Sequence, residues 1–128
     1  DILALMADAV AYSGEPEQAL ALVAQAKRLN PHFPDLYLWS EADALFALRR
    51  YEDVIACIAQ MRDPGEGCRL LAASWALLGN QAEAQRYAQI VMRRQPGFRV
   101  SDWIAIQPEA DAAELEHFGG ALRLAGLP

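Results

Sequence analysis

The feature that most constrains the fold of this chain is an internal repeat. In two separate stretches, a glycine precedes an alanine by five residues and a proline by seventeen. A fixed spacing of this kind is typical of proteins in which one supersecondary unit is stacked on the next. We therefore expect a repeat architecture. The residues that set the spacing are Gly14, Ala19 and Pro31 in the first stretch and Gly79, Ala84 and Pro96 in the second.

Between these markers the apolar residues follow a helical period. They recur at i, i+3, i+4 and i+7, which places them in one stripe along a helix with 3.6 residues per turn. Each glycine suits the left-handed residue that ends a helix, and each proline prevents the second helix from continuing. Each unit is therefore predicted to be a helix–turn–helix pair. The expected stripes are Ala19, Leu22, Val23 and Ala26; Val54, Ile55, Ile58 and Met61; and Ala84, Tyr87, Ala88 and Val91.

Composition favours an all-α fold. Apolar residues make up 54 % of the 128 residues, and alanine and leucine, both strong helix formers, dominate that fraction. Residues with high strand preference occur singly and never alternate along the chain. We predict three helix pairs at residues 1–33, 35–64 and 66–98, so that residues 1–98 form the repeats. The middle pair is degenerate, because it lacks the glycine and has Val54 where the others have alanine.

The last segment, residues 99–128, departs from the repeat pattern. Residues 100–108 are predicted to form a short helix that ends at Pro108. Asp111 and Glu114 then have the spacing of a capping box, which indicates the start of another helix. Because a terminal repeat exposes an apolar face, we expect this segment to cap the array.

The final helix carries its own apolar stripe and two consecutive glycines. Gly119 and Gly120 are expected to allow close packing or a bend, and Trp103 is expected to anchor the cap. The stripe consists of Leu115, Phe118 and Leu122.

Charge and hydropathy exclude several classes of protein. The formal net charge is −6, with 17 acidic and 11 basic residues, and the arginines form no dense cluster that could neutralise phosphates. No apolar stretch reaches the ~18–20 residues that a bilayer-spanning helix needs. Cys57 and Cys68 are too few for a disulfide framework and are typical of reduced thiols. We expect a cytoplasmic chain that binds neither nucleic acid nor membrane. Because Asp1 begins a helical pattern directly, without a leader, we also expect a part of a longer protein.

Side chains that could carry chemistry are sparse. His32 and His117 have no second histidine or cysteine three or four residues away, as a preformed zinc site would require. Residues 65–67 lack the lysine and the preceding strand of a phosphate-binding loop. The serines stand in no nucleophile-elbow context. No catalytic residue, metal site or cofactor is therefore expected, and the chain is predicted not to be an enzyme.

The repeat resembles the tetratricopeptide repeat, a helix–turn–helix unit that stacks into a right-handed superhelix. The glycine, alanine and proline positions of the first and third units carry the likeness, whereas the middle unit departs from it. A generic array of helical hairpins is the alternative fold. The final segment, with Leu115-Glu-His-Phe118 and Ala125-Gly-Leu-Pro128, is similar to the C-terminal ends of bacterial signalling proteins. Those proteins carry such repeats behind a nucleotide-cyclase or winged-helix domain.

The resemblance implies a concave groove lined by the first helix of each pair. An extended peptide or a partner helix would suit this surface, which mixes aromatic and charged side chains as binding hot spots do. We therefore predict an interaction or scaffold module that binds a protein or peptide partner, as the regulatory part of a larger protein. In the alternative interpretation, Trp39 and Phe46 simply pack between helices. The residues expected in the groove are Asp8, Tyr12, Trp39, Asp43, Phe46 and Arg69.

Two other functions remain open at this point. A small-molecule-sensing domain would need a deep apolar concavity with a few convergent polar groups. A homodimerisation module would instead pair the exposed apolar faces of terminal repeats.

Overall fold

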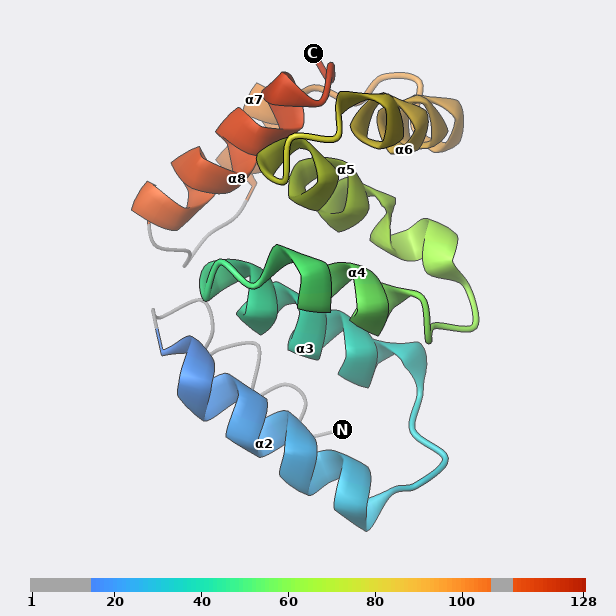
Figure 1. Ribbon diagram of the computed structural model, residues 1–128, viewed down its shortest axis with the longest axis vertical. Helices are drawn as coiled ribbons and strands as arrows, with labels where there is room; N and C mark the ends of the chain where they lie inside the picture. The colour runs from blue at the N-terminus through green and yellow to red at the C-terminus, as the bar shows by residue number, and fades with distance from the viewer. Residues whose placement is uncertain (1–14, 107–111) are drawn as a thin grey trace. The chain divides into compact units, whose positions relative to one another are not determined.

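The computed structural model describes residues 15–106 and 112–128 (Figure 1). Every regular element within these residues is a helix, which confirms the predicted all-α class. None of the helices in this part of the chain is long and apolar enough to cross a membrane. The α-helices are α2 (Pro16–Leu29), α3 (Asp35–Ala47), α4 (Tyr51–Ile58), α5 (Cys68–Leu77), α6 (Gln81–Arg94), α7 (Val100–Ala105) and α8 (Ala112–Leu124), and the 3₁₀ helix η1 (Pro64–Gly67) precedes α5.

The chain forms two compact units, Asp1–Pro64 and Gly65–Pro128. In the first unit, α3 packs against both α2 and α4 (Figure 1). The ring of Tyr37, from α3, is buried between α2 and α3 and stacks on Phe33, with ring centroids 5.7 Å apart. The stripe of α2 is buried against this ring, as its spacing predicts; the buried residues are Ala19, Val23 and Ala26.

A carboxylate fastens the chain after α4 to the beginning of α3. Backbone N–H groups of Arg62 and Asp63 donate to the two oxygens of Asp35, at 2.8 and 3.0 Å. These two bonds are the main reason why the pKa of Asp35 lies below its ordinary value of 3.8. Because Asp35 is the first residue of α3, its charge also lies where the helix dipole favours an anion. The α3–α4 hairpin is therefore held at its open end as well as at its turn.

In the second unit, α5 packs against α6 and α8, and α7 packs against α8 (Figure 1). Trp103, from α7, lies 5.0 Å from Phe118, centroid to centroid, so it anchors the final helices as predicted. A Cβ at Gly119 would lie only 2.6 Å from Ile104 Cδ1, which confirms that this glycine permits close packing. At Gly120 a Cβ would meet no atom within 4 Å. The predicted capping-box residue Asp111 and the predicted helix end at Pro108 lie outside the described residues.

Helices α2 and α6, which the glycine, alanine and proline spacing predicts to be copies of one repeat element, have similar lengths and ends. Each has 14 residues, a glutamate in its first turn and two basic residues in its last turn. In each, the backbone N–H of the residue after the helix donates to the carbonyl four residues earlier. The stripe of α6 is buried at Ala84, Ala88 and Val91. One predicted member of each stripe, Leu22 in α2 and Tyr87 in α6, is half-buried.

The turns of the two hairpins also match, including the one that lacks a glycine. Gly79 has φ 86° between α5 and α6, and Arg49 has φ 64° at the corresponding place between α3 and α4. Both turns contain the same three backbone hydrogen bonds, which run from residues 48–50 and 78–80 to the preceding helix. The middle hairpin therefore keeps the turn of its neighbour even though arginine replaces glycine.

Candidate functional site

The predicted groove residues that the structure describes fall on two helices, α3 in one unit and α5 in the other. Trp39, Asp43 and Phe46 lie four and three residues apart on α3, so they share one face of that helix. Trp39 and Asp43 are half-buried. Phe46 is only 3 % exposed, and its ring packs edge-on against Tyr51 with centroids 5.3 Å apart, which makes it part of the α3–α4 contact.

Of the three remaining groove residues, the structure describes one, Arg69. Arg69 is the second residue of α5, in the unit Gly65–Pro128, and it is half-buried. Asp8 and Tyr12 lie outside the described residues. The α3 face with Trp39 and Asp43 is therefore the part of the predicted site that the structure describes as one surface.

The first unit also contains a polar pocket that no sequence pattern indicated. Its volume is about 370 Å³, and it lies among α2, α3, α4 and the turns at the two ends of α4. Its lining combines acidic, basic, amide and thiol groups with short aliphatic side chains. The lining residues are Leu20, Glu41, Leu45, Arg50, Asp53, Ala56, Cys57 and Gln60.

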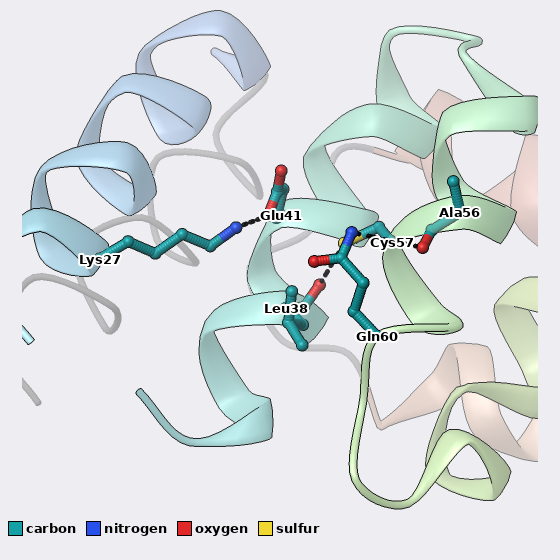
Figure 2. Close-up of polar contacts among 6 residues, drawn as sticks. All are labelled: Lys27, Leu38, Glu41, Ala56, Cys57 and Gln60. Atoms are coloured by element: carbon teal, nitrogen blue, oxygen red, sulfur yellow. Dashed lines mark hydrogen bonds and ion pairs between the residues drawn. The ribbon is translucent and has the colours of Figure 1, made fainter. Parts of the chain in front are cut away.

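An ion pair between two helices fixes the acidic side chain of this pocket. Lys27, near the end of α2, pairs with the carboxylate of Glu41 on α3 (Figure 2). The Lys27 ammonium also lies 5.2 Å from the centre of the Phe33 ring, where a cation–π attraction adds to the pairing. Since both charged side chains are only about a quarter exposed (25 % and 28 %), this pair is screened less than an open surface pair.

The thiol of Cys57 is a structural group rather than a nucleophile. Its Sγ donates to the backbone carbonyl of Leu38, 3.2 Å away, and so connects α4 to α3 (Figure 2). Burial, together with a smaller effect of the nearby Glu41 charge, raises the pKa of Cys57 to about 12. The thiol therefore stays protonated at neutral pH, where only a thiolate would be reactive. Neither Cys57 nor Cys68 forms a disulfide.

The exposed rim of the pocket is internally paired. Arg50 Nε donates to Asp53 Oδ2 at 2.8 Å. Gln60 Nε2 donates to the Ala56 carbonyl at 3.5 Å (Figure 2). A pocket lined by paired charges and a protonated thiol offers hydrogen bonds to a polar ligand, but it supplies no activated base or nucleophile. Within the described residues, no group of three or more His, Cys, Asp and Glu side chains could hold a metal ion.

One part of this pocket could be read from the sequence. Arg50 and Asp53 are three residues apart at the start of a predicted helix, a spacing that often forms an ion pair. Lys27 and Glu41 are fourteen residues apart on different helices, so their meeting depends on how α2 and α3 pack. No family model, no curated protein and no solved structure matches this chain.

Proposed function

We propose that this chain is a tetratricopeptide-type repeat module that binds a peptide segment of a partner protein. The observation that carries the proposal is the recurrence of one hairpin turn, with the same hydrogen bonds and the same left-handed residue, at Arg49 and at Gly79. A recurring hairpin is the building unit of helical repeat arrays, whose common use is to present an extended binding surface. In this proposal the hairpins stack into a right-handed superhelix.

The binding face proposed for the first unit lies on α3, around Trp39 and Asp43. Trp39 offers a large, half-buried ring, and Asp43 offers a half-buried carboxylate one helical turn away. Aromatic side chains next to charged groups are enriched at the centre of protein interfaces. The carboxylate favours a peptide that carries a basic residue next to an apolar one. We further propose that the module is the regulatory part of a larger bacterial signalling protein, whose repeats transmit the binding event rigidly.

The test is partner capture by the immobilised protein, followed by titration with a peptide from the captured partner. The double variant Trp39→Ala with Asp43→Lys should abolish capture while the helical circular dichroism spectrum remains unchanged. The matched control is Ile106→Ala with Glu52→Lys, because Ile106 is 72 % exposed and Glu52 is exposed on α4, away from Trp39 in sequence. Capture that survives the double variant, or that is lost equally in the control, would show that the α3 face is not the binding site.

A second function, the sensing of a small polar molecule, is favoured by the pocket of about 370 Å³ beside Cys57. Ligand pockets of this size are at the small end of the usual range. If this pocket is the functional site, the purified protein should carry a small molecule that native mass spectrometry detects. Gln60→Leu should then release that molecule, whereas Gln18→Leu on the exposed side of α2 should not.

A further inference from the structure

The exposed side of α8, the last helix, carries few charges. Its exposed residues lie on one side of the helix, because they recur at intervals of three or four. Four of them are alanine, glycine or leucine, and only two are charged. None of them lines the polar pocket beside Cys57. These residues, which form the α8 face, are Ala112, Ala113, Glu116, Gly120, Arg123 and Leu124.

The leucine of the α8 face is held in place by the end of the helix. The Leu124 carbonyl accepts a hydrogen bond from Gln81 Nε2 at 2.8 Å, which connects the end of α8 to the start of α6. The N–H of Gly126, which has φ 108°, donates to the Arg123 carbonyl and closes the last turn. The Leu124 residue is nevertheless 54 % exposed. Covering such an ordered apolar side chain with another surface is favourable, because it removes apolar area from water.

A glycine in the middle of the α8 face leaves the backbone open. A Cβ built at Gly120 would meet no atom within 4 Å, whereas one at Gly119 would collide with Ile104. Packing within the unit therefore explains the first of the two glycines but not the second. Glycine is less favourable than alanine inside a helix, but it lets another backbone approach closely. The open surface at Gly120 is therefore suited to a second helix.

Two charges on either side of this glycine make the α8 face complementary to itself. Glu116 lies four residues before Gly120, and Arg123 lies three residues after it. In the part of the chain that the structure describes, neither charged side chain has an ion-pair partner. If two α8 helices pack antiparallel about a two-fold axis at Gly120, each arginine comes level with the other glutamate to within about 1.5 Å along the helix. A parallel pair would instead place like charges opposite each other, which is unfavourable.

We propose that the α8 face binds the same face of a second copy of this chain, in a two-fold antiparallel pair of helices. Gly120 lies at the axis, Arg123 of each copy pairs with Glu116 of the other, and Leu124 is covered by the opposite helix. One helix from each copy makes a small interface, so the dimer is weak and dissociates on dilution. This interaction goes beyond peptide binding, because it joins two copies of the chain and uses a helix of the other unit.

The test is the mass of the protein by sedimentation equilibrium, from micromolar to millimolar concentration. The mass should rise from the 14.1 kDa of one chain towards twice that value. Glu116→Arg and Arg123→Glu, each alone, bring like charges together twice, so each should raise the dissociation constant about tenfold. The combined variant restores both pairs and should dimerise like the wild type. Glu52→Arg, at an exposed site on α4, is the matched control and should leave the dimer unchanged.

A further variant separates the dimer from the stability of the single chain. Gly120→Gln adds a side chain whose Cβ meets no atom within 4 Å, so the urea midpoint at low concentration should rise. The same side chain keeps the two backbones apart, so the dimer should be lost.

Several results would overturn this dimer. They are a constant wild-type mass, growth beyond two copies, and a combined variant that does not recover the dimer. A dimer that survives Gly120→Gln, or one that Glu52→Arg weakens as much as Glu116→Arg does, would also exclude the α8 face. None of these outcomes depends on partner capture, so the α3 face is judged separately.

Discussion

The two hairpin turns have the same backbone but different residues. The turn before α6 reads Gly79-Asn80, and the turn before α4 reads Arg49-Arg50. Gly79 adopts a left-handed φ without steric cost, and Asn80 caps α6 by accepting the N–H of Glu83 at 3.2 Å. Arg49 adopts the same left-handed φ at a cost of about 1 kcal/mol or more, and Arg50 makes no capping bond with its side chain. The turn at Arg49 therefore forms because packing imposes it, whereas the turn at Gly79 is favoured by its own residues.

The size of the buried side chains after the two turns differs in the opposite direction: the less favourable turn is followed by the larger apolar residues. The buried apolar residues that follow the turn at Arg49, two in α4 and one just after it, are bulkier than those of α6 at each of the three positions that correspond when the turns are aligned. We infer that burial of these residues offsets the unfavourable turn before α4, at about 25 cal/mol for each Å² of apolar surface removed from water. The corresponding residues are Val54, Ile58 and Met61 after the turn at Arg49 and Ala84, Ala88 and Val91 after the turn at Gly79, and all six are buried.

The largest expected effect comes from removing that burial. Ile58 is 0 % exposed, so Ile58→Ala should lower the free energy of unfolding by about 2–5 kcal/mol through lost transfer energy and the cavity that remains. Urea unfolding followed by circular dichroism measures the loss, and hydrogen exchange should place it in α3 and α4. Ile106→Ala, at a site 72 % exposed, is the control and should change stability little. A small loss at Ile58 would mean that the first turn is held by something other than this stripe.

Exchanging the turn residues tests the comparison directly. Gly79→Ala should destabilise the protein by about 1–2 kcal/mol, because a Cβ is strained at φ 86°. Arg49→Gly should have the opposite sign and stabilise it by up to about 1 kcal/mol, since the strain is relieved but the unfolded chain gains freedom. Both changes are measured as shifts of the urea midpoint. If both variants were destabilised, the Arg49 side chain would have to contribute contacts that outweigh its strain.

The capping residues should give a smaller contrast. Asn80→Ala should cost about 1 kcal/mol, since it leaves the Glu83 N–H at the start of α6 without its acceptor. Arg50→Asn could install the same cap on α4, but it also removes the Arg50–Asp53 ion pair, so the net gain should be less than the loss at Asn80. Thermal unfolding of the two single variants compares them. A larger gain at Arg50 than the loss at Asn80 would contradict this ranking.

Features set by neighbouring residues could be predicted from the sequence, whereas features set by packing could not. The helix class and the similar ends of α2 and α6 could be predicted, because glycine, proline and a spaced apolar stripe act on the backbone within a few residues. The turn at Arg49 could not, since arginine carries no local signal for a left-handed φ. The middle hairpin was predicted to be degenerate partly for that reason and partly because Val54 replaces an alanine, although the hydrogen bonds of its turn match those of its neighbour.

The two candidate sites differ in the same way. The α3 face could be proposed, because Trp39 and Asp43 are one turn apart on a predictable helix. The pocket beside Cys57 could not, because it depends on Lys27 reaching Glu41 across two helices and on the Cys57 thiol reaching the Leu38 carbonyl. Such contacts depend on the distance and rotation between packed helices, which no local pattern of residues determines.

Acid should destabilise the α3–α4 hairpin at its open end, where Asp35 binds the chain after α4. The pKa of Asp35 is lowered by the donating N–H groups of Arg62 and Asp63, so its stabilisation is present above its ordinary value of 3.8. That stabilisation is lost as the pH falls from 3.8 through the lower value of the folded state. Asp35→Asn should therefore flatten the pH dependence of unfolding below about pH 4. An identical slope in Asp35→Asn and the wild type would exclude this contribution.

The smallest expected effect comes from removing the negative charge in the first turn of α4 or of α6. Asp53 pairs with Arg50 at 2.8 Å, and Glu83 pairs with Arg86 at 2.9 Å. Both pairs are exposed and i,i+3, so Asp53→Asn and Glu83→Gln should change the thermal midpoint only slightly, and the change should disappear at about 1 M salt. Arg86 keeps its hydrogen bond to the Tyr87 hydroxyl when Glu83 is neutralised, whereas Arg50 has no other partner among the described residues. Asp53→Asn should therefore show the larger of the two salt-sensitive shifts. A loss that persists in high salt, or one as large as that of Ile58→Ala, would mean that these carboxylates support the turns through their position at the helix start and not through their arginines.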